Sequence, residues 1–165
     1  MATTALGDQP VQTSGELPAV GSLAPDYVLT GNDLSDVTSA ALRGRRVVLN
    51  IFPSIDTTTC ATSVRTFNKL AAGLDETTVV CVSADLPFAM RRFCGAEGID
   101  DVVTASVFRS DFGSTYGVTM LDGRMRGLLA RAVVVVDRDG SVLHAELVPS
   151  IGQEPDYDAA VAALS

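Results

Sequence analysis

The sequence predicts an α/β domain with a central mixed β-sheet flanked by helices on both faces. Three apolar runs have the composition and length of buried strands, and stretches with helical spacing lie between them. A last stretch alternates apolar and polar residues, which indicates an antiparallel partner strand. Strands that alternate with helices are typical of a sheet covered on both sides. The three apolar runs are residues 47–52, 78–83 and 132–136.

For the N-terminal residues 2–45 the sequence predicts only short elements of regular structure. Residues 2–14 favour a small β-hairpin around the turn Gly7-Asp8-Gln9-Pro10. Residues 15–45 are expected to be irregular, because proline and glycine interrupt them. Within this stretch we expect a short strand at 27–30 and one helical turn at 39–43.

The first long apolar run leads into the stretch around which the chain is organised. Pro53 lacks an N–H and should end the strand. Thr57, Thr58 and Thr59 are possible N-caps, and apolar residues recur at helical spacing from Val64 to about residue 73. This pattern places Cys60 in the first turn of a helix, where unpaired N–H groups and the helix dipole stabilise a thiolate.

The second apolar run is followed by a second helix. Asp85 is a plausible N-cap with Pro87 near the first helical position, and Gly95 is a good residue to end the helix after Cys94. A short strand at 104–107 and a helical turn at 111–117 should follow.

The last third of the chain begins with a loop at 118–130, before the third apolar run. The turn Asp137-Arg138-Asp139-Gly140 joins that run to the alternating stretch 141–148, which predicts a hairpin. A final helix should run from Glu154-Pro155 to Leu164. With no linker or repeat, residues 1–165 are predicted to form a single domain.

Composition and charge exclude several classes of protein. Hydrophobic residues make up 47% of the 165 residues and charged residues 19%, so an acidic disordered chain is excluded. The net charge of −8 argues against nucleic acid and anionic membrane as partners. There is no apolar stretch of membrane-spanning length and no signal-peptide pattern, so we expect a cytoplasmic protein with reduced cysteines.

The sequence supports a different interpretation for each of the three cysteines. Cys60 is a candidate nucleophile, although a buried cysteine can also act as a small hydrophobe. Cys94 shares a helix face with Met90, so packing and chemistry are both open for it. Cys81 lies among valines and is predicted to be a core residue. No Cys-x-x-Cys pair, metal-ligand spacing or phosphate-binding glycine pattern is present, so neither a metal nor another cofactor is expected.

Two further residues carry possible chemistry. Arg131 stands directly before the third apolar run; it is either a solvated strand end or a fixed cation beside a thiolate, and its position leaves both open. His144, the single histidine, lies at a polar position of the alternating stretch. A Cys-His hydrolase would need this histidine held beside Cys60 by a third group. A single histidine on a surface strand is a poor candidate for that role, so a hydrolase is disfavoured.

The motif Pro53-x3-Thr57-x2-Cys60 resembles the active-site pattern of peroxiredoxins. Several surrounding segments resemble the bacterial thiol peroxidase branch of that family, over nearly the whole chain. These segments are 54–57, 61–68, 83–89, 92–98, 127–132 and 154–157.

The resemblance implies a thioredoxin-like fold, a homodimer and an atypical two-cysteine mechanism. Cys60 would be the peroxidatic cysteine, and Cys94 would resolve it as a disulfide inside one subunit. Thr57 and Arg131 would polarise the peroxide, and Pro53 would shield the site from water. Thioredoxin would be the reductant, and hydrogen peroxide with alkyl and lipid hydroperoxides would be the substrates. An alternative is a redox-sensing interaction module that uses the same two cysteines to switch a partner.

Overall fold

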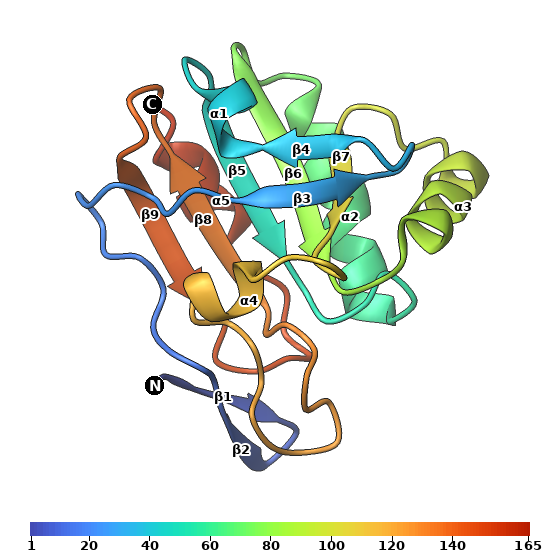
Figure 1. The fold of residues 1–165 in the computed structure, drawn as a ribbon, viewed down its shortest axis with the longest axis vertical. Coiled ribbons are helices and arrows are strands. Elements are labelled where there is room, and N and C mark those ends of the chain that lie inside the picture. Colours follow the sequence, from blue (N-terminus) through green and yellow to red (C-terminus); the bar gives the residue numbers. More distant parts are fainter.

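The computed structural model describes all of residues 1–165. Its strands and helices follow the alternation that the sequence predicts (Figure 1). The strands are β1 (Thr3–Leu6), β2 (Gln9–Gln12), β3 (Val28–Gly31), β4 (Asp36–Thr38), β5 (Arg46–Ile51), β6 (Thr77–Ser83), β7 (Val103–Ser106), β8 (Ala132–Val136) and β9 (Val142–Leu147). The helices are α1 (Ser39–Leu42), α2 (Thr58–Ala71), α3 (Pro87–Glu97), α4 (Phe112–Thr115) and α5 (Tyr157–Ala162).

Seven strands form one mixed sheet in the order β4-β3-β7-β6-β5-β8-β9. The central strands β5, β6 and β7 are parallel to one another, and the other neighbours in the sheet pair antiparallel. Strands β1 and β2 form a separate two-stranded hairpin, in which Gly7 begins the two-residue turn with a φ of 65°. The predicted α/β class with a mixed sheet and an N-terminal hairpin is therefore confirmed.

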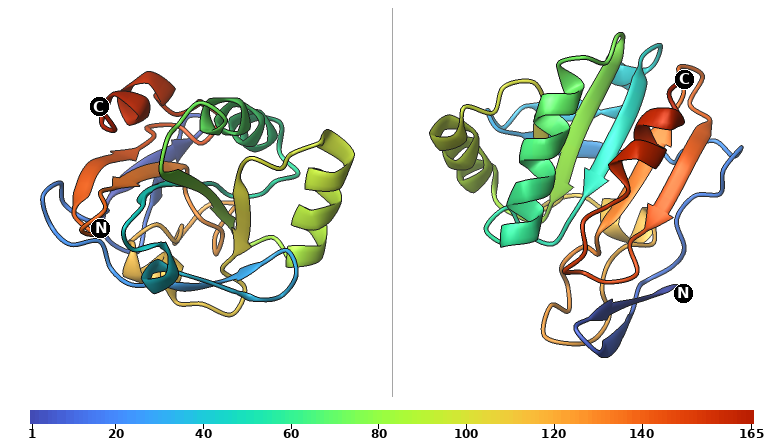
Figure 2. Two further views of the ribbon diagram at one scale, coloured as in Figure 1. Left: turned by 90° about the horizontal axis from the view of Figure 1, so that it is seen from above. Right: turned by 180° about the vertical axis from the view of Figure 1, so that it is seen from behind.

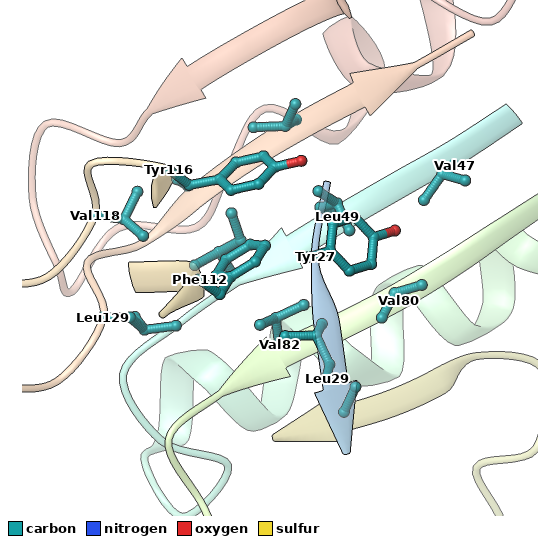
Figure 3. Packing of buried hydrophobic residues seen from close by; sticks show 14 of the residues in the cluster. Tyr27, Leu29, Val47, Leu49, Val80, Val82, Phe112, Tyr116, Val118 and Leu129 are labelled. Atoms are coloured by element: carbon teal, nitrogen blue, oxygen red, sulfur yellow. The ribbon is translucent and has the colours of Figure 1, made fainter. Parts of the chain in front are cut away.

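Each face of the sheet carries its own core. One face packs against α2 and α5, and the other lies under α1 and α4, as Figure 2 shows from two sides. On the second face Phe112 stacks on Tyr116 with ring centroids 4.3 Å apart, and Tyr27 packs edge-on against both rings (Figure 3). Valines that alternate along β8 point into the two cores in turn, which explains why this strand is apolar throughout.

Some element boundaries differ from the prediction. The helix that carries Cys94 continues through Gly95 to Glu97, because Gly98 supplies the left-handed C-cap conformation with a φ of 66°. The last helix begins at Tyr157, not at Glu154, because Asp156 is its N-cap and accepts a hydrogen bond from Ala159 N at 3.0 Å. Strand β4 was not predicted; its three residues are too few to give an alternating pattern. No helix has the length and apolar character that crossing a membrane requires.

Candidate active site

Cys60 lies in the first turn of α2, as the sequence predicts. The turn before it contains Pro53, which is buried directly after the apolar end of β5. Thr57 occupies the N-cap position, but its hydroxyl donates to Ser54 O at 3.1 Å and caps no backbone N–H. The hydrogen bond from Ala61 N to Thr57 O is the first of the helix, so the N–H of Cys60 lies at the open, positive end of the dipole.

Arg131 is brought directly against Cys60. Strand β8 pairs antiparallel with β5, and Ala132 lies opposite Ile51, so the residue before β8 meets the loop after β5. The Arg131 Nη2 atom lies 3.2 Å from Cys60 Sγ. Both side chains are almost fully buried, at 1% and 0% exposure. The structure thus decides where Arg131 lies: it is not a solvated strand end but a buried cation in contact with the Cys60 sulfur.

A backbone carbonyl fixes the orientation of the Arg131 side chain. Nε and Nη2 both donate to Ile151 O, at 2.9 and 2.8 Å. The remaining nitrogen, Nη1, is buried and has no hydrogen-bond partner. Leaving a buried guanidinium nitrogen without a partner is costly, so Nη1 is free to donate a hydrogen bond to an oxygen atom of a ligand. The contact of Ile151 with Arg131 could not be predicted from the sequence, because any residue type can supply a backbone carbonyl.

Hydrogen bonds to Asp85 connect the loop before Cys60 with the loop before α3. Its carboxylate accepts hydrogen bonds from Ser54 Oγ at 2.8 Å, from Ile55 N at 2.7 Å and from Ser83 Oγ at 2.5 Å. The expectation that Asp85 caps α3 was wrong, since Leu86 holds the N-cap position and the Asp85 carboxylate is committed to these donors. The effect is to hold the turn that contains Pro53 and Thr57 in one conformation.

Cys94 is not brought into contact with Cys60. It lies in the last turn of α3, where it is buried and its Sγ is 3.8 Å from Thr104 Oγ1 of β7. All three cysteines are free thiols. Two exposed ion pairs connect α3 to the region of Cys60: Arg65 with Glu97, and Arg92 with Asp56 at 3.6 Å. Residues from both parts line a surface pocket of about 280 Å³: Asp56, Arg65, Arg92, Phe93, Ala96 and Glu97.

The Redoxin family model matches residues 19–161 of this chain. The chain belongs to the Redoxin family. It is 59% identical over 164 residues to a thiol peroxidase of Mycobacterium tuberculosis, covering 99% of both chains. It is 52% identical over 165 residues to a thiol peroxidase of Corynebacterium glutamicum, covering 100% of both. The similarity to bacterial thiol peroxidases that the motifs indicate is thereby confirmed, and so is the enzyme class, a peroxiredoxin-type oxidoreductase.

A solved Redoxin-like structure agrees with the fold. The peroxiredoxin-like protein of Aquifex aeolicus superposes with a TM-score of 0.94 at 38% sequence identity, covering 99% of this chain and 96% of that one. The thioredoxin-like arrangement implied by the motifs is therefore confirmed. The hairpin β1–β2 lies before the residues matched by the Redoxin model, which begin at residue 19.

Two other candidates, His144 and Cys81, make no hydrogen bond to the sulfur of Cys60. His144 is half-buried on β9 opposite Val135, and no hydrogen bond joins it to Cys60 or Arg131. No group of three or more histidine, cysteine or acidic side chains is placed to hold a metal ion. Cys81 is fully buried on β6, where Asn50 Nδ2 lies 3.7 Å from its sulfur. Burial raises the pKa of Cys81 to about 12, so it stays a neutral thiol at physiological pH.

We expect Cys81→Ser to leave peroxide turnover nearly unchanged and to lower the free energy of unfolding by roughly 1–3 kcal/mol. The reason is that a hydroxyl is placed among apolar side chains of the core around α2. Urea unfolding and initial rates on the same preparation measure both effects. Cys81→Ala, which keeps the position apolar, is the matched control. Finding Cys81 in the main disulfide of the oxidised protein would contradict its assignment as a core residue.

Proposed function

We propose that the protein is a thiol-dependent peroxidase in which Cys60 attacks the substrate and Cys94 resolves the product. The observation that carries this proposal is the 3.2 Å contact between Arg131 Nη2 and Cys60 Sγ. A cysteine attacks as a thiolate, and a buried, permanently charged guanidinium at this distance is placed to act as the counter-ion of that thiolate. The open start of α2 acts in the same direction.

In the first step the Cys60 thiolate attacks one oxygen of a hydroperoxide. The S–O bond forms as the O–O bond breaks, the leaving oxygen takes a proton, and an alcohol or water departs. Cys60 is oxidised by two electrons to a sulfenic acid. Negative charge grows on the leaving oxygen, and preorganised donors at that oxygen accelerate such a step.

The donors that we propose for this step surround Cys60. Arg131 Nη1, which has no partner in the protein, donates to a peroxide oxygen, and so does the backbone N–H of Cys60. The Thr57 hydroxyl donates to Ser54 O and keeps its lone pairs free to accept a hydrogen bond from the peroxide O–H. Buried Pro53 offers no backbone N–H to water and keeps this space dry.

In the second step Cys94 attacks the Cys60 sulfur and releases water, leaving a disulfide within one subunit. A dithiol protein then reduces that disulfide by exchange, and we propose thioredoxin for this role. We further propose that the enzyme acts on hydrogen peroxide and on alkyl and lipid hydroperoxides. The same proposal includes a homodimer in the cytoplasm, with each subunit folded as a single domain over residues 1–165.

The test is peroxide consumption coupled to NADPH oxidation through thioredoxin and thioredoxin reductase. Hydrogen peroxide and a longer alkyl hydroperoxide are compared as substrates, and omission of thioredoxin is the control. We expect many turnovers per subunit with both substrates. One equivalent of peroxide consumed per subunit, with no further turnover, would instead favour a redox-sensing module that switches a partner.

We expect formation of the Cys60–Cys94 disulfide to open α3 locally. A disulfide requires Cα atoms within roughly 7 Å of each other, whereas Cys60 begins one helix and Cys94 ends another. Helix α3 is the part that gives way, because exposed ion pairs such as those between α3 and the Cys60 region contribute little to stability.

The measurement is amide hydrogen exchange of the reduced and the oxidised protein. Exchange at residues 86–98 should be faster after oxidation, while the central strands β5 and β6 serve as the internal reference. Equal exchange in both states at residues 86–98 would show that the disulfide forms without opening this helix.

A further inference from the structure

The N-terminal hairpin β1–β2 packs against the residues that hold Arg131. It lies outside the seven-stranded sheet, beside the loops that precede β8 and follow β9 (Figure 1). Val11 of the hairpin is 1% exposed and forms a small apolar cluster with Met120, Ala130 and Ile151. Ala130 directly precedes Arg131, and Ile151 supplies the carbonyl that Arg131 binds. The hairpin therefore packs against Ala130, the residue before Arg131, and against Ile151, its hydrogen-bond acceptor.

Hydrogen bonds also connect strand β1 with residues 148–151, which follow β9. Thr4, which is 2% exposed, donates from Oγ1 to Val148 O at 2.8 Å. Ile151 N donates to Ala5 O, also at 2.8 Å, and Val148 N donates to Arg131 O at 3.0 Å. Strand β1 thus holds both ends of residues 148–151, a segment that belongs to no helix or strand.

The position of this segment decides where the guanidinium points. Two of its nitrogens converge on the single carbonyl of Ile151, and a rigid planar fork held in this way has one orientation. That orientation places Nη2 3.2 Å from Cys60 Sγ. If residues 148–151 shift, the carbonyl shifts with them and the guanidinium follows.

We infer that the hairpin is a positioning element for the reaction: it fixes residues 148–151 so that the Ile151 carbonyl aims Arg131 at Cys60. This inference rests on the proposed function, because it assigns the hairpin a part in the peroxide step. Thr4 is the positioning residue, acting through Val148, Ile151 and Arg131 without touching the substrate. Misplacement of a catalytic group by about 1 Å can cost on the order of 10²-fold in rate, so a segment without secondary structure needs such a support.

The test compares Thr4→Val, which removes the buried donor without changing the shape of the side chain, with Thr4→Ser, which keeps the donor. Thr3→Val is the matched control on the exposed side of the same strand. The readouts are the rate constant for oxidation of Cys60 by hydrogen peroxide and the rate constant for its alkylation by iodoacetamide. Alkylation needs the thiolate but no donors to a leaving peroxide oxygen.

We expect Thr4→Val to lose on the order of tenfold in the peroxide rate constant, with a smaller loss in alkylation. Thr4→Ser and Thr3→Val should stay close to the unmodified protein. The inference is overturned if Thr4→Val keeps its peroxide rate, if Thr4→Ser falls equally far, or if both reactions of Thr4→Val slow alike. If the unmodified protein fails to react with peroxide, the proposed function fails instead.

A second variant tests the same inference without touching a polar group. Val11→Ala shortens the apolar contact of the hairpin with Ala130 and Ile151. It should show the same selective loss of the peroxide rate, to a smaller extent. An unchanged ratio of the two rate constants in a folded Val11→Ala protein would count against the hairpin as a positioning element, even if Thr4→Val does not fold.

Discussion

Cys60→Ser is expected to lower peroxide turnover by several orders of magnitude, to the rate of the reaction without enzyme. A serine hydroxyl is far too weakly acidic to supply the nucleophile, even beside a guanidinium 3.2 Å away. The measurement is the initial rate in the thioredoxin-coupled assay, with circular dichroism to establish that the variant is folded. Cys81→Ser is the matched control, since it makes the same chemical change at another fully buried cysteine. Substantial turnover by purified, folded Cys60→Ser would end the assignment of this residue.

Arg131→Met should lower the rate constant for Cys60 oxidation by on the order of 10²–10³-fold. Methionine fills much of the same space, but it supplies neither the cation that favours the thiolate nor the donor at Nη1. Stopped-flow measurement of Cys60 oxidation, together with thiolate absorbance as a function of pH, separates the two effects.

Two further arginine variants separate the effect of the charge of Arg131 from that of its hydrogen-bond geometry and provide a control. Arg131→Lys keeps the charge but cannot place two nitrogens on Ile151 O, so its rate should fall between those of Arg131→Met and the unmodified protein. Arg43→Met is the control, because Arg43 is exposed and pairs only with Asp26 at the surface. If Arg131→Met kept both the rate and the thiolate absorbance, the cation would have no part in the reaction.

Most of the fold could be predicted because its strands are local apolar runs. The predicted strands 47–52, 78–83 and 132–136 correspond to β5, β6 and β8, and none of their ends is displaced by more than one residue. The ends of helices were harder to place. Both Gly95 and Gly98 could end α3, and the choice depends on a backbone conformation that forms only when the next segment folds back. The role of Asp85 was missed for a similar reason, since its partners Ser54 and Ile55 lie far away in the sequence.

The site was predictable where a sequence pattern carries the chemistry. A strand, a proline turn and a helix start place Cys60 without any knowledge of the sheet. Arg131 could not be decided in this way, because only the antiparallel pairing of β8 with β5 carries it to Cys60. The support of Arg131 by Ile151 O, and of that segment by Thr4, has no sequence signal at all: the first is a backbone carbonyl, and the second lies more than 100 residues away.

The proposed disulfide requires Cys94 to move toward Cys60. Its pairing with Cys60 is implied by the peroxiredoxin motifs, and the reduced protein keeps it apart, at the end of α3 against Thr104. Because exposed ion pairs contribute little to stability, we expect the contacts between α3 and the region of Cys60 to open when the proposed disulfide forms.

The assignment of Cys60 and Cys94 is tested by mapping the disulfide that one equivalent of hydrogen peroxide produces in the reduced protein. An equal mixture of ¹⁵N-labelled and unlabelled protein is oxidised, free thiols are blocked with iodoacetamide, and the peptides are analysed by mass spectrometry without reduction. We predict one main cross-linked species, which joins the Cys60 peptide to the Cys94 peptide with both halves labelled or both unlabelled, while Cys81 stays a thiol. A main species that contains Cys81, a pair with one labelled half, or overoxidised Cys60 beside a free Cys94 would contradict it.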